Sequence, residues 1–257
     1  SSTVQAVETV TAAKNGTISS NGLIAVGNGA QAAGQGAIAI GNMSNVTGCQ
    51  STAIGQNNTV AGTGSTVIGR NVKTLSCQTD QIALAHDLNL TCASFSLKST
   101  YIGHNITGSA SSGATWGFSC STVIGSNMNF VVNQSSVSGL ARSSIIGNNI
   151  NYNSHSLSCV TMMGENLTFK GEALGHSNVI GRYVNISAYN SSGSGMSSGY
   201  RIVNQLSLLG SCVTLNSNSS ITRTLATGSQ IDVRTKNDGG ITESGFIGYD
   251  ININSSK

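Results

Sequence analysis

The sequence predicts an all-β, single-domain parallel β-solenoid, and three observations lead to this fold class. A motif of two apolar residues and a glycine ends at Gly27, Gly41, Gly55 and Gly69, fourteen residues apart each time. The motif continues at wider spacing as far as Gly248, which indicates about thirteen coils. The 257 residues include 32 Gly and no Pro that would interrupt a regular winding. A short fixed period with glycine at one phase is typical of a chain that makes one coil per repeat.

We expect three regions along this solenoid. Residues 1–20 precede the first clear coil and form an N-terminal cap or an incomplete coil, because the outer edge of a terminal repeat is unpaired. Residues 21–73 carry the regular fourteen-residue repeat of the roll. Residues 74–257 continue the solenoid with longer coils, and their insertions all fall on one edge, because the extra length follows the same strand in each coil.

Each position can be numbered relative to the motif glycine, which is position zero. An aliphatic column stands at position −1, from Val26 to Ile247, and apolar columns stand at +3 and +5 with a polar column between them at +4. Such alternation predicts a strand with one buried face. We therefore expect columns −1, +3 and +5 to face the core and column +4 to face water.

Column −2 decides the functional prediction. Neighbouring residues in a strand point to opposite faces, so a core-facing column −1 puts column −2 outside. A continuous apolar stripe about 60 Å long is not expected on a free monomer. We expect this stripe to mediate self-association, unless insertions of the same chain fold back over it. Its members are Ala25, Ala39, Ala53, Val67, Ala83, Tyr101, Val123, Ile145, Met162, Val179, Leu208, Ala226 and Phe246.

An asparagine column follows the motif glycine by two residues. Asn tolerates left-handed backbone and bonds locally to the chain, so the column predicts a turn after each motif. Stacked coils set equivalent side chains about 4.8 Å apart, which predicts an asparagine ladder. A sugar-binding strip is the functional alternative for the same residues. The column contains Asn57, Asn71, Asn105, Asn127, Asn149 and Asn166.

The segment GQGAIAIGNMSNVTG, from Gly34 to Gly48, resembles the YadA-like head repeat of trimeric autotransporter adhesins, as does the next turn from Ser51 to Gly62. The close match covers about residues 21–73. This resemblance implies a left-handed parallel β-roll that assembles as a homotrimer and binds a host-surface or matrix receptor. Similar rolls also occur in phage and viral fibres. An end-to-end filament is the alternative assembly, because Ile251 and Ile253 keep the core phase in the last strand and we expect another copy to stack on its edge. Either assembly implies an extracellular location, on a cell or virion surface.

The composition limits the kinds of partner and cofactor that we expect the chain to bind. Only 8% of the residues are charged and the formal net charge is +3, which is too small and dispersed for a nucleic-acid footprint. No apolar run reaches the length that spans a membrane, so we expect no membrane insertion. The cysteines show none of the zinc spacings, and we expect neither a metal nor another cofactor.

Two kinds of covalent modification follow from the remaining residue pattern. Six cysteines in a chain rich in Asn, Ser and Thr favour an oxidising compartment, and Cys77 and Cys92 flank one coil as a candidate disulfide. Buried free thiols are the alternative. Among the many N-x-[ST] sequons, Asn45, Asn89 and Asn185 fall in the outward column +4 and are candidates for glycosylation.

We expect no enzymatic activity, because the nine acidic residues are scattered and place no pair of catalytic carboxylates. The alternatives are a carbohydrate-active β-helix enzyme, an acyltransferase with hexapeptide coils, and an ice-binding solenoid. The first two have longer coils than the fourteen-residue coils with which this chain begins. An ice-binding array of Thr52, Thr66, Thr100 and Thr122 at position −3 would need to face water, whereas column −3 shares the inward phase expected for column −1.

Overall fold

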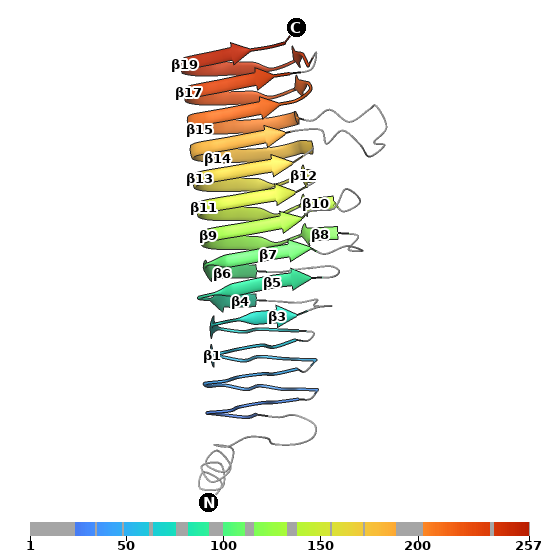
Figure 1. Ribbon diagram of the computed structural model, residues 1–257, viewed down its shortest axis with the longest axis vertical. Helices are drawn as coiled ribbons and strands as arrows, with labels where there is room; N and C mark the ends of the chain where they lie inside the picture. The colour runs from blue at the N-terminus through green and yellow to red at the C-terminus, as the bar shows by residue number, and fades with distance from the viewer. Residues whose placement is uncertain are drawn as a thin grey trace, which may run out of the picture.

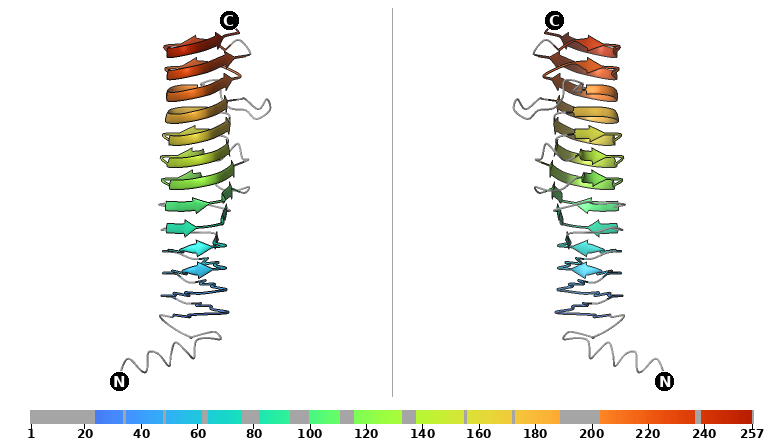
Figure 2. Two further views of the ribbon diagram at one scale, coloured as in Figure 1. Left: turned by 90° about the vertical axis from the view of Figure 1, so that its left-hand side faces the viewer. Right: turned by 90° about the vertical axis from the view of Figure 1, so that its right-hand side faces the viewer.

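The computed structural model describes residues 24–256, except 34, 48, 62–63, 76–81, 93–99, 111–115, 133–137, 155, 172, 189–202 and 237–238. Within these residues the chain is an all-β parallel β-solenoid with about six turns in its regular part (Figure 1). Side views show a narrow column of stacked coils (Figure 2). The predicted cap over residues 1–20 and most of the predicted insertions lie outside the described residues.

The regular elements of the described part are strands. Seven of them, β9, β11, β13, β14, β15, β17 and β19, have ten or more residues and form the regular part of the stack. The strands are β1 (Gly55–Gln56), β2 (Gly69–Arg70), β3 (Lys73–Leu75), β4 (Ile82–Ala85), β5 (Leu88–Cys92), β6 (Thr100–His104), β7 (Ile106–Ala110), β8 (Trp116–Ser119), β9 (Thr122–Val132), β10 (Ser138–Ala141), β11 (Ser144–Ser154), β12 (Ser156–Ser158), β13 (Thr161–Gly171), β14 (Ala173–Ala188), β15 (Val203–Ser217), β16 (Ile221–Thr222), β17 (Leu225–Thr235), β18 (Ile241–Thr242) and β19 (Gly245–Asn254).

Strands of neighbouring coils pair in parallel, and their register aligns the motif glycines. Gly103 lies opposite Gly125, and Gly147 lies opposite both Gly125 and Gly164. The first coils contain few strand residues, but the same stacking holds there, since the Gly55 N–H donates to the Ile40 carbonyl at 2.7 Å. The repeated motif therefore sets the register of the whole stack.

The motif residue is glycine because successive backbones come too close for a side chain. A Cβ added at Gly125 would overlap the carbonyl oxygen of Gly103, and a Cβ at Gly147 would overlap that of Gly125. Gly147 also has φ of +156°, which L side chains rarely adopt. The first coils are looser, since a Cβ at Gly55 would lie 3.8 Å from the nearest atom, the Ile40 carbonyl oxygen.

Each regular coil turns at two corners, where non-glycine residues have left-handed backbone. The first corner is at the asparagine column, with φ of 52° at Asn127 and 53° at Asn149. The second corner lies before position −4 and was not predicted, because no single residue type marks it. Its left-handed residues are Cys120, Arg142, Cys159, His176, Gln205, Arg223 and Glu243.

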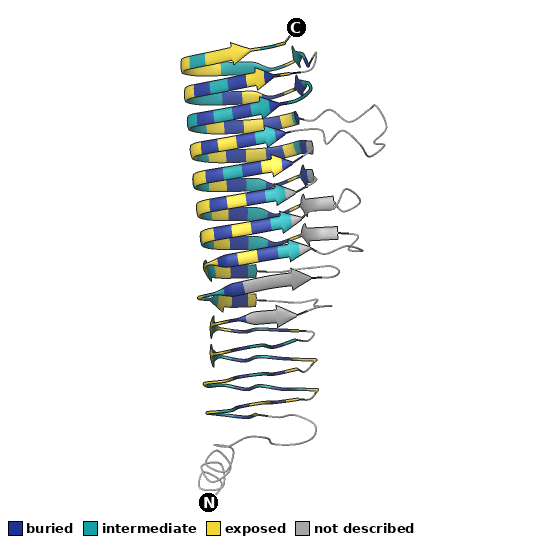
Figure 3. Cartoon of the chain, in the orientation of Figure 1, coloured by how far each residue is buried: buried dark blue, intermediate teal, exposed yellow. Residues whose placement is uncertain are grey.

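The core is lined by columns −2, +3 and +5, so the predicted phase of columns −2 and −1 is wrong. Every predicted stripe residue from Ala25 to Leu208, and Ala226, is only 0–3% exposed, and Phe246 is half-buried against the core. Figure 3 shows buried residues alternating with exposed ones along the upper strands. The physical reason is the first corner, whose left-handed residue shifts the alternation by one position between −2 and +3. The prediction from the sequence assumed that inward-facing and outward-facing residues alternate through this corner without a shift.

Two rows of side chains show how the interior is filled. Phe130, Tyr152 and Phe169 stack in column +5, with ring centroids 5.8 and 6.2 Å apart. Buried hydroxyls at position −4 satisfy backbone groups beside the second corner, as at Ser177, whose Oγ accepts from the Val160 N–H and donates to the Gly175 carbonyl. A comparison of the residues at position −4 in successive coils would have revealed this serine row.

The close approach at the motif glycines predicts different costs for the same substitution. Gly147→Ala forces a Cβ into the carbonyl of the coil below, and we expect it to lower the free energy of unfolding by about 3 kcal/mol. Gly55→Ala has room for its Cβ and is expected to cost less than about 1 kcal/mol. Urea denaturation of both variants checks this. Equal destabilisation would contradict the steric explanation of the motif.

Candidate functional site

An exposed apolar row runs along the outside of the solenoid at position −1. Its eight large aliphatic side chains lie in consecutive coils and are 37–51% exposed. We call it the isoleucine row, and it consists of Ile68, Leu84, Ile102, Ile124, Ile146, Met163, Ile180 and Leu209. With one step of about 4.8 Å per coil, the row is about 34 Å long.

The isoleucine row extends beyond these eight coils. Val26, Ile40 and Ile54 continue it as half-buried residues toward the N-terminus, and Ile247 continues it after the interruption at Thr227. The apolar stripe that we predicted therefore exists, one residue along the chain from its predicted position.

A threonine row borders the isoleucine row at position −3. Its members are half-exposed and share the outward direction of column −1, so the prediction that column −3 faces inward is wrong. The one-residue shift at the corner accounts for this error too. The row contains Thr52, Thr66, Thr100, Thr122, Ser144 and Thr161, and Ile82 interrupts it between Thr66 and Thr100.

The outward column +4 is polar, as expected. Asn129 and Asn151 are exposed, and the Asn151 Nδ2 donates to the Asn129 Oδ1 at 2.7 Å. Of the candidate glycosylation residues, Asn185 is exposed, whereas Asn45 is half-buried with its Oδ1 enclosed and lacking a hydrogen-bond partner. The Asn89 side chain lies outside the described residues. One outer face of the roll is thus apolar and another is polar.

Side-chain hydrogen bonds join the asparagine column into a ladder. The Asn166 Nδ2 donates to Asn149 at 2.9 Å, Asn149 to Asn127 at 3.1 Å, and Asn127 to Asn105 at 3.3 Å. Asp87 takes the next place and accepts from both Asn105 and Asn71. Asn57 is exposed in the looser first coils, where Asn28 and Asn42 bond instead at position +1. The ladder bonds use one donor and one acceptor of each amide from Asn105 to Asn149, as the predicted ladder requires.

Two histidines stack beside the ladder at position +1. The His86 and His104 ring centroids are 6.0 Å apart, and the His86 Nδ1 lies 3.1 Å from the Asp87 carboxylate. The pKa of Asp87 is lowered, first by the hydrogen bond from Asn105 and then by the one from His86. Nowhere in the described residues do three or more His, Cys, Asp or Glu side chains gather closely enough to hold a metal ion.

The candidate disulfide cannot be located, because Cys77 and the side chain of Cys92 lie outside the described residues. Three described cysteines, Cys120, Cys159 and Cys212, are free thiols. The first two are exposed at the second corner, so the alternative of buried thiols is wrong for them.

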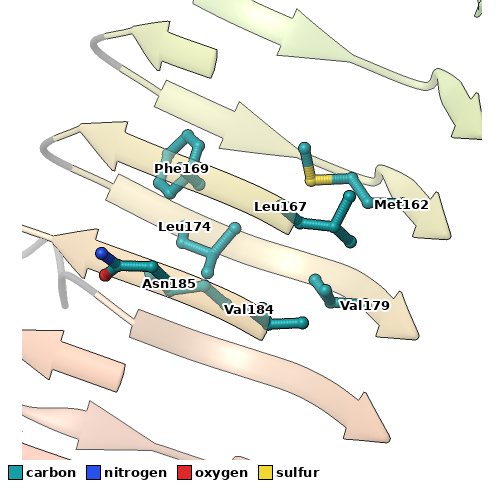
Figure 4. Close-up of a pocket in the computed structure, with 8 residues that line it drawn as sticks. Met162, Leu167, Phe169, Leu174, Val179, Val184 and Asn185 are labelled. Atoms are coloured by element: carbon teal, nitrogen blue, oxygen red, sulfur yellow. The ribbon is translucent and has the colours of Figure 1, made fainter. Parts of the chain in front are cut away.

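The hollow spaces differ in chemistry. A small void of about 10 Å³ lies inside the core between Met162, Leu167 and Val179 (Figure 4). It is apolar and has room for one water at most, so it is a packing defect. A larger hollow of about 350 Å³ opens on the surface where β14, β15 and β17 end, and six of the seven residues that line it are polar or charged.

Comparisons with known proteins add no family to this description. No family model matches the chain, and the searches of curated proteins and of solved structures likewise give no match. The described part of the chain contains no helical segment with the length and apolar character that a membrane crossing requires.

The position of Asp87 in the ladder predicts a specific acid sensitivity. Its pKa in the folded chain is below the unfolded value of about 3.9, so its contribution to stability is full above that pH and is lost as pH falls through the lower folded pKa. Thermal unfolding should show a larger loss between about pH 5 and about pH 2 for the wild type than for Asp87→Asn. An equal loss in both proteins would contradict this role.

Proposed function

We propose that the chain is an extracellular structural β-roll that packs side by side with copies of itself through the isoleucine row. The single observation that carries this proposal is the row itself, eight aliphatic side chains exposed by 37–51% in consecutive coils. Single exposed hydrophobic residues are common on soluble proteins, but a contiguous apolar row of this length is typical of an interaction surface.

The direction of the row favours side-by-side packing over an end-to-end filament. Because the row runs parallel to the long axis of the solenoid, every additional coil adds one more contact between two molecules that lie side by side. Three copies around an axis parallel to the rows bury each row once and form a closed assembly. This agrees with the homotrimer implied by the resemblance of residues 21–73 to the YadA-like head. Left-handed winding and about thirteen coils are part of the same proposal.

The polar face remains available in such an assembly. Column +4, with exposed residues such as Asn129, Asn151 and Asn185, points away from the core on a different face from the isoleucine row. This face presents amides and hydroxyls to a host-surface or matrix receptor, or carries glycans at Asn185. The proposal assigns no chemical reaction to the chain.

Replacing the centre of the row tests self-association. Ile102→Thr, Ile124→Thr and Ile146→Thr in one variant keep β-branched side chains and exchange an apolar row for a polar one. The wild type should have about three times the chain mass of 26.1 kDa by light scattering, and the variant should have the mass of one chain. Because each site is exposed, we expect each substitution to change the unfolding free energy by less than about 0.5 kcal/mol.

A matched control lies on the polar face of the same coils. Asn129→Thr with Asn151→Thr should leave the native mass unchanged, because column +4 takes no part in the contact. A wild-type protein that is monomeric at high concentration, with Ile124 open to solvent, would refute the proposal.

Ice is a second candidate for the same face, favoured by the outward threonine row. Thr100 and Thr122 lie beside Ile102 and Ile124, and the coil stacking repeats this pair of methyl-bearing and hydroxyl-bearing side chains at about 4.8 Å. A regular array of this kind can order water at spacings close to those of ice. The objection raised from the sequence, an inward threonine row, does not apply to these positions.

Thermal hysteresis of the purified protein tests the ice hypothesis. Ice binding predicts measurable hysteresis that Thr122→Lys abolishes and Asn129→Lys on the polar face leaves intact. Absence of hysteresis at millimolar concentration removes this candidate. A trimeric mass with no hysteresis leaves self-association as the function of the face.

A further inference from the structure

The surface hollow at the ends of β14, β15 and β17 is a second site, separate from the isoleucine row. It has a volume of about 350 Å³, within the range of small-molecule sites in proteins. Three successive coils contribute its lining, since Ser187 and Ala188 end β14, Asn216 and Ser217 end β15, and Arg234 lies near the end of β17. Asn218 and Lys236 complete the lining just after their strands.

Backbone hydrogen bonds hold the rim of this hollow in place. The Asn218 N–H donates to the Ala188 carbonyl at 2.9 Å, and the Lys236 N–H donates to the Ser217 carbonyl at 3.0 Å. Thr235, between Arg234 and Lys236, is buried and its hydroxyl donates to the Gly239 carbonyl at 2.6 Å. The side chains that line the hollow therefore start from a fixed backbone.

The charges of the hollow leave one cation available. Arg234 donates twice to Asp232, from Nε at 3.1 Å and from Nη2 at 2.6 Å, and this carboxylate raises the pKa of Arg234. The guanidinium is therefore charged and already paired. Lys236 is exposed, and its ammonium has no ion pair or hydrogen bond among the described residues.

The neutral groups of the hollow suit hydroxylated ligands. In the described part of the chain, the side-chain amides of Asn216 and Asn218 have no hydrogen-bond partner, unlike the amides of the asparagine ladder. Each amide offers donors and an acceptor, which is the combination that a sugar hydroxyl needs. Ser187 adds a hydroxyl whose Oγ donates to the Asn185 Oδ1 and has acceptor capacity left.

We propose that this hollow binds a carboxylate-bearing sugar residue, with the carboxylate on Lys236 and the hydroxyls on Asn216 and Asn218. A charge-assisted hydrogen bond is stronger than a neutral one, so the acid group supplies selectivity over neutral sugars. Such residues occur at the ends of sialylated glycans and along glycosaminoglycans, and both present the same chemistry. The site does not depend on self-association, because it lies on other columns than the isoleucine row.

Titration of the full-length chain with three free sugars tests this site. Saturation-transfer NMR is recorded with N-acetylneuraminic acid, glucuronic acid and glucose at millimolar concentration. We expect at least one of the acids to bind about tenfold more tightly than glucose, as one charge-assisted hydrogen bond provides. Binding of N-acetylneuraminic acid alone indicates a sialylated ligand. Binding of both acids indicates that the site recognises the carboxylate of sialylated glycans and of glycosaminoglycans alike. Failure of both acids to bind would overturn the proposal.

Variants separate a built site from general attraction to a basic surface. Lys236→Gln should weaken binding of the acids about tenfold and leave glucose unchanged, because Lys236 contacts only the carboxylate. Asn216→Asp should also weaken binding of the acids about tenfold, because it adds a negative charge and removes an amide donor. Arg142→Gln is the control, since Arg142 is an exposed cation at the second corner of an earlier coil and does not line the hollow. Unchanged affinity in the first two variants, or an equal loss in the Arg142 variant, would also overturn the proposal. Circular dichroism and the light-scattering mass of each variant show that fold and assembly are retained, so this result is independent of the isoleucine row.

Discussion

The structure depends on how closely successive backbones approach at the motif glycines. From Gly103 onward, a single added carbon at this position would overlap the carbonyl oxygen of the coil below. The approach aligns Gly103 with Gly125 and Gly125 with Gly147, and the strands on both sides of the corner follow in register. Every other row of the molecule, including the core columns, the ladder and the isoleucine row, is a consequence of this alignment.

Much of the fold could be predicted because the repeat places equivalent residues at fixed positions. The period and the glycine column indicate a parallel solenoid, the polar column +4 indicates an outward face, and the asparagine column indicates the first corner. Which of columns −2 and −1 faces the core could not be derived in the same way, because both columns are apolar. Only the left-handed residues at the corner, such as Asn127 with φ of 52°, decide it, and backbone angles are not readable from two adjacent apolar columns.

The candidate surfaces differ in how much sequence information they carry. Two adjoining apolar columns in one strand require that one of them faces out, so an exposed apolar row was predictable even though the wrong column was chosen. The surface hollow carries no such signal. Ser187, Asn216 and Arg234 all stand at position +6, and they lie side by side because their strands pair in register. Position +6 shares no residue type from coil to coil, so the sequence aligns these residues but does not mark them as a site.

Because equivalent strands stack on one another, the length of the molecule can change while its width stays the same. A coil touches the coils directly before and after it, and the pairing of Gly147 with Gly125 on one side repeats in its pairing with Gly164 on the other. Duplication or loss of one whole coil therefore changes the height by about 4.8 Å while the cross-section stays the same. In evolution such a chain can adjust its reach in uniform increments through recombination between repeats, without redesigning its interior.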